Sequence, residues 1–257
     1  MSTQPATPTL SADLEAGLKR LKLAAIRRQA PDILLTAQTQ RWKPEETLRV
    51  LVDLEITARD EANTRNRMTT ARFPVHKTLD EFNVDESSIP TASHDYLITL
   101  DWITRADNLC LVGPAGTGKT HYLIALGRAA VEAGHRVRYF TAAELVEHLW
   151  RATADNTVGK TIETLCRNQL LIIDEIGFAP LDHTGCQLLF RLVAAAYEKR
   201  SLAIASHSPF ENWGRFLPDQ PTAVSLLDRL CHHAHIITTT GDSYRLTHRT
   251  TGGTTMT

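Results

Sequence analysis

A glycine-rich octapeptide between an apolar run and an amphipathic run constrains this chain more than any other feature. Its residues are Gly113, Pro114, Ala115, Gly116, Thr117, Gly118, Lys119 and Thr120. The apolar run 109–112 before it predicts a buried strand, and the run 122–131 after it predicts a helix. A G-x-x-x-x-G-K-[ST] pattern between a strand and a helix predicts a loop that binds phosphate. The alternative, an ordinary glycine turn, is disfavoured by this placement.

The loop offers the groups that a nucleoside triphosphate needs. Its glycines allow successive backbone N–H groups to point toward an anion, and the helix that follows adds the positive end of its dipole. Lys119 is expected to neutralise the β- and γ-phosphates, and the Thr120 hydroxyl is expected to bind Mg²⁺. The nucleotide-binding segment is therefore expected to run from Gly113 to His121, with ATP and Mg²⁺ as its ligands.

Two adjacent carboxylates follow a second apolar run. The aliphatic residues 170–173 precede Asp174 and Glu175, and such a run is typical of a central parallel strand that is buried on both faces. The carboxyl end of that strand is expected beside the phosphate loop. Asp174 then becomes a second Mg²⁺ ligand, and Glu175 becomes the catalytic base that orients and deprotonates water. The alternative is a surface Asp-Glu pair without a role.

Two further polar residues are candidates for the same reaction. His207 follows the apolar run 202–206, so it is expected to reach the γ-phosphate or the attacking water. A loop histidine without a role is the alternative. Arg229 lies in a predicted short helix over 224–231, and an arginine at a subunit edge can complete the site of a neighbouring copy. A structural ion pair with Asp228 is the competing interpretation.

The remaining histidines and the cysteines predict no further site. His232, His233 and His235 invite a metal interpretation, but no acidic or cysteine partner is evident and the surrounding residues favour a strand. We therefore assign no zinc site to them. The 4 cysteines are widely scattered without a C-x-x-C pair, which is typical of buried reduced thiols rather than disulfides.

The start of the chain predicts a small basic helical unit. Ser11 is a candidate N-cap for a helix that continues through Ala25, and a second helix is expected from Pro44 to Arg72. The second helix directs these apolar side chains toward a core: Leu48, Leu51, Val52, Leu54 and Ile56. Residues 1–72 carry 12 Lys and Arg against 9 Asp and Glu, a net charge of +3. This excess suits phosphate contacts to nucleic acid, and a solvated helix face is the alternative.

Four arginines are the first candidates for contact with DNA: Arg27, Arg28, Arg65 and Arg67. No helix-turn-helix or zinc module is readable in the sequence. We therefore expect contacts to the DNA backbone, guided by how easily the duplex deforms, rather than recognition of a base sequence.

Changes in pattern divide the chain into four segments. Residues 1–72 are expected to form a helical domain for DNA binding or oligomerisation, and 73–92 a linker anchored by Leu79 and Phe82. Residues 93–249 are expected to form the nucleotide domain, and 250–257 a disordered tail.

Within 93–249, strands and helices alternate. Besides the two strands above, strands are expected at 136–140, 202–206, 234–238 and 243–247. A polar exposed loop is expected at 152–160, and Trp102 is expected in the core. Alternation of this kind predicts a three-layer α/β sandwich with a mostly parallel sheet.

Bulk properties exclude several classes of protein. The formal charge of −1 over 257 residues excludes a uniformly basic protein, so any nucleic-acid surface must be a local patch. No apolar run is long enough to span a membrane, and the polar start of the chain does not resemble a signal peptide. We expect a cytoplasmic protein without a membrane partner.

Taken together, these residues resemble the IstB family of ATP-binding transposition helpers and, more distantly, the DnaC helicase loaders. Both are AAA+ ATPases. The resemblance extends from about Leu18 to Arg249, through the helical start and 78–82, 100–103, 113–120, 171–177, 209–216, 228–233 and 241–246. It implies an AAA+ P-loop NTPase sandwich preceded by a small all-α domain.

The same resemblance implies a function. Such a protein assembles on duplex DNA, deforms it, recruits or stimulates a transposase, and is regulated by ATP hydrolysis. Recognition of the DNA is expected to be largely independent of sequence. Neighbouring copies would share ATP, with Lys119, Thr120, Asp174 and Glu175 acting within one copy and Arg229 acting on the next.

Two features depart from the family pattern. Relatives usually carry Thr-Ser-Asn where this chain has Ala205-Ser206-His207, so an imidazole replaces the amide that senses the γ-phosphate. No helical lid is readable after Thr247, so Arg245 is either a nucleotide sensor or a surface strand residue.

Three rival functions remain open from the sequence. A helicase loader would use the same chemistry on a protein partner. An ATP-gated architectural DNA binder would bind without turnover. A small-molecule kinase is disfavoured by the basic helical segment.

Overall fold

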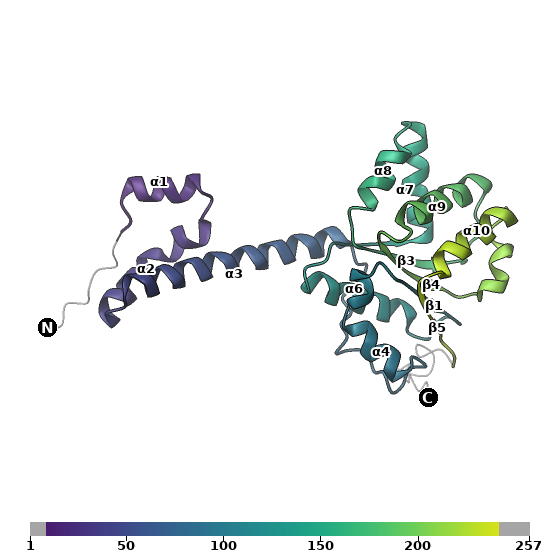
Figure 1. Cartoon of the computed structure of the whole chain (residues 1–257), viewed down its shortest axis with the longest axis horizontal. Helices are drawn as coiled ribbons and strands as arrows, with labels where there is room; N and C mark the ends of the chain where they lie inside the picture. Colours follow the sequence, from purple (N-terminus) through teal and green to yellow (C-terminus); the bar gives the residue numbers. More distant parts are fainter. Residues whose placement is uncertain (1–8, 242–257) are drawn as a thin grey trace, which may run out of the picture. The chain divides into compact units, whose positions relative to one another are not determined.

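The computed structural model describes residues 9–241. The chain divides into two compact units, and the boundary along the sequence lies between Asn66 and Arg67. The described residues of the first unit form helices and no strand. The second contains a parallel sheet with helices on both faces (Figure 1). The sequence predicted both the helical start and the α/β class, and the structure confirms both.

The first unit is built from helices α1 (Ala12–Arg20), α2 (Ala24–Gln40) and most of α3 (Pro44–Ala71). Ser11 is the N-cap of α1, as predicted. The helix expected to run through Ala25 instead ends at Arg20, and Lys22 in the break has a φ of +57°. Helix α2 was not predicted as a separate helix, because its buried residues are only small alanines and it contains Pro31.

A carboxylate on α3 holds the start of α2. Glu55 is buried, and its Oε2 accepts the backbone N–H groups of Ala25 and Ile26 at 2.9 and 3.1 Å. Its Oε1 accepts Arg59 Nε at 3.1 Å. Because the first N–H groups of a helix have no partner within the helix, this side chain acts as an N-cap supplied from another helix.

The apolar face predicted for α3 is largely exposed, which corrects the expectation of a core there. Leu48 and Ile56 expose 62% and 52% of their surface, and Val52 is exposed as well. Leu51 and Leu54 are half-buried. The reason is that α2 buries only alanine side chains and is tied to α3 through Glu55, so little of that apolar face is covered.

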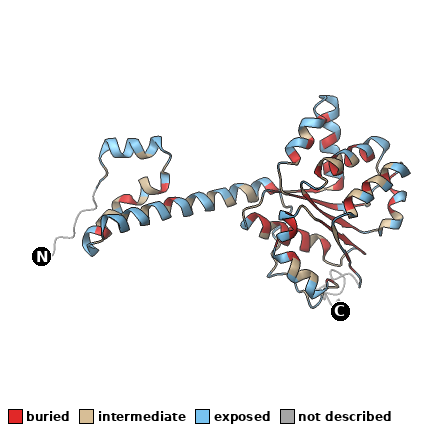
Figure 2. Ribbon diagram, viewed as in Figure 1, coloured by how far each residue is buried: buried red, intermediate tan, exposed pale blue. Residues whose placement is uncertain are grey.

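The sheet of the second unit has five parallel strands in the order β2-β3-β4-β1-β5. Their bounds are β1 Asn108–Val112, β2 Val137–Thr141, β3 Leu170–Ile176, β4 Ser201–Ser206 and β5 Ala234–Thr238. The first four are buried along nearly their whole length (Figure 2). Runs of aliphatic residues form such strands because both faces of a parallel sheet are covered.

Alternate side chains of each strand enter two separate cores. Leu109 and Leu111 pack toward α4 (Thr91–Ile98), α5 (Asp101–Thr104) and α6 (Lys119–Glu132). Cys110 and Val112 pack toward the helices on the other face. Those helices are α7 (Ala142–Ala154), α8 (Val158–Leu165), α9 (His183–Ala196), the 3-10 helix η1 (Phe210–Arg215) and α10 (Gln220–Cys231). This is the predicted three-layer sandwich.

Several local expectations can be compared directly. Trp102 is fully buried, as predicted. Residues 73–90 contain neither helix nor strand, and Leu79 and Phe82 pack against the core beside α6, as expected of anchors. The polar loop expected at 152–160 is wrong in part, because α7 reaches Ala154 and α8 begins at Val158.

The predicted strand 243–247, with Arg245, and the predicted tail 250–257 lie outside the described residues. Within the described part of the chain, no helix is both long enough and apolar enough to cross a membrane.

Candidate nucleotide site

The glycine-rich loop joins the end of β1 to the start of α6, and its backbone leaves the ordinary range at three glycines. Gly113, Gly116 and Gly118 have φ angles of +153°, +87° and +86°. A Cβ atom on Gly113 would lie 2.0 Å from the carbonyl oxygen of Thr239. Only glycine fits at this position, because both the φ angle and the space exclude a side chain.

Lys119 is buried, and its ammonium lies on the inner side of the loop. Its Nζ donates to the carbonyl oxygens of Gly113 and Pro114, both at 2.6 Å. The lysine therefore holds the two ends of the loop together in this structure. An anion in the loop would compete for the same N–H groups, since a phosphate oxygen is a stronger acceptor than a carbonyl.

Thr239, just after β5, closes the base of the loop. It is fully buried, its N–H donates to Val112 O at 2.7 Å, and its Oγ1 lies 2.8 Å from Thr117 Oγ1. Sequence reasoning missed this residue because its role depends on the pairing of β5 with β1. The parallel register pairs Val112 with Thr238 and so brings the next residue against the loop.

Asp174 is buried at the end of β3 and accepts two hydrogen bonds. Tyr139 Oη donates to its Oδ2 at 2.8 Å, and the N–H of Glu175 donates to its Oδ1 at 2.8 Å. Burial, and then the charge of Asp174, raise the pKa of Tyr139 well above its usual value. Tyr139 therefore remains a donor, and it fixes the carboxylate in one orientation.

Sequence reasoning missed Tyr139 as well. It lies on the adjacent strand β2, where Thr141 pairs with Asp174. Because residues two positions apart on a strand share a face, Tyr139 is a diagonal neighbour of the carboxylate. Only the register of the two strands reveals this contact.

Glu175 is exposed and has a φ of +59°, the left-handed region that residues with a Cβ rarely adopt. It lies where the register between β3 and β4 shifts, since Ile173 pairs with Ile204 and Ile176 pairs with Ser206. The extra residue on β3 is a β-bulge, which turns a side chain out of the sheet. Backbone strain of this kind concentrates at functional sites.

The order of the strands brings the candidate residues to one edge of the sheet. Strand β4 lies between β1, which leads to the phosphate loop, and β3, which leads to the two acids. Ser206 at the end of β4 pairs with Val112 on one side and with Ile176 on the other. His207 follows it, is exposed, and has its ring 6.3 Å from that of Phe178.

The glycine-rich loop and the two acids thus lie on either side of the central strand β4. Residues 16–252 match the family described as IstB-like ATP binding protein. The chain belongs to this family. This confirms the resemblance stated from the sequence.

Several relatives of this IstB-like chain cover nearly all of it. One from Pseudomonas aeruginosa, named for insertion sequence IS21 and for ATP binding, is 34% identical over 94% of this chain and 91% of its own length. One from Geobacillus stearothermophilus, named for insertion sequence IS5376 and for ATP binding, is 32% identical over 88% of this chain and 91% of its own. Both names associate the relatives with insertion sequences.

Solved structures show the same fold. AMPPCP-bound DnaA from Aquifex aeolicus matches with a TM-score of 0.53 and 20% identity, over 64% of this chain and 50% of DnaA. A DnaI structure matches with a TM-score of 0.53 and 16% identity, over 64% of this chain and 92% of the other. At these identities the likeness concerns the fold alone, and it agrees with the α/β sandwich described above.

Arg229 lies in the last part of α10 of the IstB-like chain. Its Nη1 donates to Ser225 O at 2.9 Å, and its Cζ lies 5.2 Å from the centre of the Phe190 ring on α9. Among residues 9–241, no ion pair joins it to Asp228, so the competing interpretation of Arg229 as half of a structural ion pair finds no support. The guanidinium is therefore oriented by helix packing and has no carboxylate bound to it there.

His121 directs its side chain toward the segment that precedes α4. Its Nε2 lies 3.4 Å from Thr78 O, and its ring packs at 5.3 Å against Phe82. The pKa of the His121 imidazole is lowered, mainly because the ring is partly buried. Its position next to Thr120 thus links the phosphate loop to the segment 73–92.

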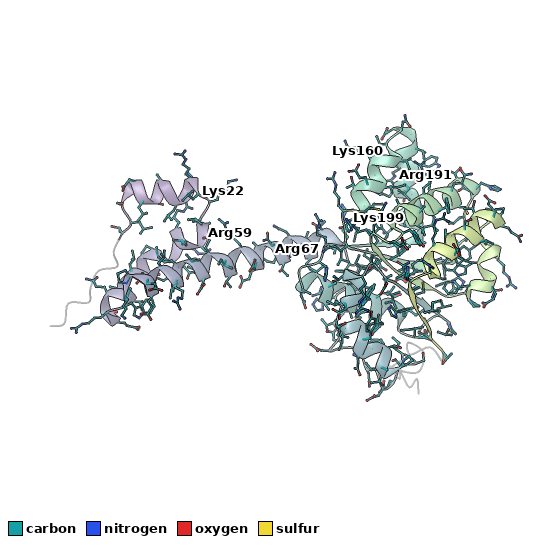
Figure 3. The ribbon with its side chains drawn as sticks, in the orientation of Figure 1. Lys22, Arg59, Arg67, Lys160, Arg191 and Lys199 are labelled. Atoms are coloured by element: carbon teal, nitrogen blue, oxygen red, sulfur yellow. The ribbon has the colours of Figure 1, made fainter. Side chains whose placement is uncertain are left out.

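The four arginines considered for DNA contact are divided between the two units. Arg27 is half-buried and Arg28 is exposed, and both lie on α2. Arg65 is exposed with Glu61 at 3.5 Å. Arg67 belongs to the second unit, and it is labelled on α3 in Figure 3. The structure therefore does not bring the four together on one unit.

Proposed function

We propose that this IstB-like protein is an ATPase that binds duplex DNA and assists a partner transposase. The bulged end of β3 supports hydrolysis most strongly, because it buries Asp174 and exposes Glu175 in a strained conformation at the edge where the phosphate loop lies. A protein that only bound ATP would have no need for an exposed carboxylate held at the cost of strain.

The residues have distinct roles in the proposed reaction. The loop 113–121 holds the triphosphate, and Lys119 moves from the loop carbonyls to the β- and γ-phosphates. Glu175 orients the attacking water and accepts its proton. His207, at the end of the central strand, donates a hydrogen bond to the γ-phosphate in place of the amide of relatives.

The donor set of the site fits Mg²⁺. Asp174 is a buried carboxylate that is held by two donors and retains lone pairs, and Thr120 lies in the first turn of α6. These two side chains would hold the ion, since Mg²⁺ prefers oxygen ligands. When bound, Mg²⁺ neutralises charge on the β- and γ-phosphates. Tyr139 then serves to orient one of its ligands.

The remaining parts of the proposal concern assembly. We place ATP between neighbouring copies, with Arg229 acting on the site of the next copy, because its guanidinium packs on α9 and, within residues 9–241, pairs with no carboxylate. We assign DNA binding or oligomerisation to residues 1–72, where exposed cations and the exposed apolar side chains of α3 lie. Names of relatives that refer to insertion sequences support a transposase as partner.

Replacement of Glu175 by Gln tests the proposed hydrolysis. We expect turnover of ATP in the presence of long duplex DNA to fall by about 100- to 10,000-fold, the usual contribution of a positioned base. Binding of ATP and of DNA should persist, because the amide keeps the size of the side chain. Phosphate release measures the first, and fluorescence anisotropy measures the second.

Glu163→Gln is the matched control, since Glu163 is an exposed helix residue with Arg167 at 3.6 Å. Turnover in the control should equal that of the original protein. Full hydrolysis by Glu175→Gln would remove Glu175 from the role of base. No phosphate release by the original protein with DNA present would instead favour the ATP-gated DNA binder, in which His207 has suppressed turnover.

A further inference from the structure

We propose that Glu198, His232 and His233 bind a transition-metal ion of the Zn²⁺ type. One ligand atom from each of the three lies within 4.8 Å of the others. His233 Nε2 lies 3.5 Å from Glu198 Oε1, and His232 Nδ1 lies 4.0 Å from the same oxygen. Ligand atoms of a tetrahedral zinc ion lie about 3.4 Å apart, given bonds of about 2.1 Å. Small side-chain rotations would close this set around an ion.

The fold supplies the acidic partner that the sequence did not reveal. Glu198 follows α9 and lies more than thirty residues before the histidines, yet it contacts both of them. His235, the third histidine of the sequence cluster, points elsewhere. Its Nε2 lies 3.8 Å from Asp107, and its ring packs at 4.7 Å against Tyr96. The proposed ligand set therefore omits His235 and includes a carboxylate from a distant part of the sequence.

A buried asparagine fixes the two segments that carry the ligands. Asn108, at the start of β1, donates its backbone N–H to His233 O at 2.7 Å and its Nδ2 to Leu230 O at 2.9 Å. Its Oδ1 accepts the N–H of Leu202 at 2.9 Å. One residue thus ties the end of α10 to the start of β4, where Glu198 lies just upstream. Such preorganisation lowers the cost of ordering a metal site.

The position of the site also favours a cation. His232 is the C-cap of α10, and the last carbonyl groups of a helix carry partial negative charge. The site lies at the amino ends of β4 and β5, whereas the phosphate loop and the acids lie at the carboxyl ends of the parallel strands. The proposed metal site and the Mg²⁺ site of the proposed ATPase therefore lie at opposite ends of the parallel strands.

The donor set selects the kind of metal. Two imidazoles and one carboxylate suit Zn²⁺ and its neighbours better than Mg²⁺ or Ca²⁺, which prefer oxygen alone. Three protein ligands leave a fourth position for water. A bound ion would join the end of α9 to the end of α10, the helix that carries Arg229. The proposed site would thus lie about one helical turn from Arg229 and would fix the end of the helix that carries it.

Tyr197 provides a test of the ligand geometry. Its Oη lies 2.8 Å from His232 Nδ1, so the hydroxyl competes with the ion for that nitrogen. Tyr197→Phe should therefore bind Zn²⁺ at least as tightly as the original protein. Weaker binding by this variant would contradict the assignment of Nδ1 as a ligand.

The main experiment is a titration of the metal-free full chain with Zn²⁺ against a chromophoric chelator. Glu198→Gln and His233→Ala should each weaken binding at least tenfold, while His183→Ala, an exposed histidine on α9, should leave it unchanged. All three positions are exposed, so the variants are expected to fold, which circular dichroism checks. Equal affinity in all four proteins would overturn the proposal.

Two further measurements separate this site from the cysteines. Zn²⁺ should raise the thermal midpoint of the original protein more than that of Glu198→Gln, because an ion that binds only the folded state stabilises it. Co²⁺ in place of Zn²⁺ should show the absorption of a site with nitrogen and oxygen ligands. A thiolate-to-cobalt charge-transfer band would instead identify cysteine ligands and overturn the proposed set.

Discussion

At the scale of single residues, the position of Asp174 depends on the hydroxyl of Tyr139. The hydroxyl donates to Oδ2 of a carboxylate that exposes only 2% of its surface. Tyr139→Phe would leave that oxygen without this donor while the ring stays in place. We expect the free energy of unfolding to fall by about 1–2 kcal/mol, the cost of removing a partner from a buried polar group. Urea denaturation measures this change.

Tyr96→Phe is the matched control for this prediction. The Tyr96 ring is half-buried, and within the described residues its hydroxyl has no hydrogen bond. Its replacement should change stability by less than about 0.5 kcal/mol, as is usual for a substitution away from such features. If the two variants lost the same stability, the hydrogen bond to Asp174 would not be the cause.

Residues that belong to a local sequence motif could be predicted from the sequence. Residues whose role depends on how separate strands or helices lie against one another could not. The loop 113–120 and the pair Asp174-Glu175 were found because their spacing is fixed within one strand–loop unit. Tyr139 and Glu198 were missed because their partners lie on other elements. The strain at Glu175 was also invisible, since a β-bulge depends on how two strands pair.

At the scale of elements, the segment 73–92 is held to the helix of the phosphate loop by aromatic contacts. Phe82 packs against His121 and, at 4.8 Å, against Tyr122. It also closes on Gly118, where an added Cβ would lie 3.1 Å from the Phe82 ring. The start of α6 is thus covered by a segment without helix or strand.

This covering predicts a specific pH dependence. Burial lowers the pKa of His121, so the unfolded chain binds a proton there more readily than the folded one. The contribution to stability is therefore present above the ordinary histidine pKa and is lost as pH falls through the lower, folded value. We expect His121→Gln, which keeps a donor toward Thr78, to lose less stability than the original protein between pH 7.5 and pH 5.

Thermal midpoints at the two pH values measure the effect. Burial also lowers the pKa of His135 and His148, so both proteins should lose some stability in acid, and the difference between them isolates His121. An identical loss in the two proteins would contradict the buried position of this ring.

Elements with strong apolar periodicity were predicted well, and those built on small or polar residues were not. The aliphatic strands and α6 follow the predicted ranges closely because burial on both faces demands them. Helix α2 was missed because Ala25, Ala30 and Ala37 are its buried residues. The apolar side chains of α3 were read as a core, yet several are exposed. Periodicity shows which face is apolar, but not whether anything covers it.

At the scale of the whole molecule, the proposal requires sites that are shared between copies. Arg229 packs on Phe190 of its own chain and donates to Ser225, and these contacts leave its guanidinium available to a neighbour. If it acts on the next copy, Arg229→Ala and Glu175→Gln impair different halves of each site. Alone, each variant should hydrolyse ATP at least about 100-fold more slowly, since an arginine finger and a catalytic base each contribute that much or more.

Mixing the two inactive variants tests the sharing of sites. In a mixed assembly, a site is complete when the Arg229→Ala copy supplies Glu175 and the Glu175→Gln copy supplies Arg229. About a quarter of the interfaces have this composition when equal amounts of the two variants mix at random. We expect phosphate release to rise to roughly a quarter of the original rate, because each complete site then stabilises the transition state with both groups. A mixture of Glu175→Gln with Arg215→Ala, an exposed arginine on η1, measures the effect of dilution alone. No recovery in a mixture shown to co-assemble would place Arg229 in the site of its own chain.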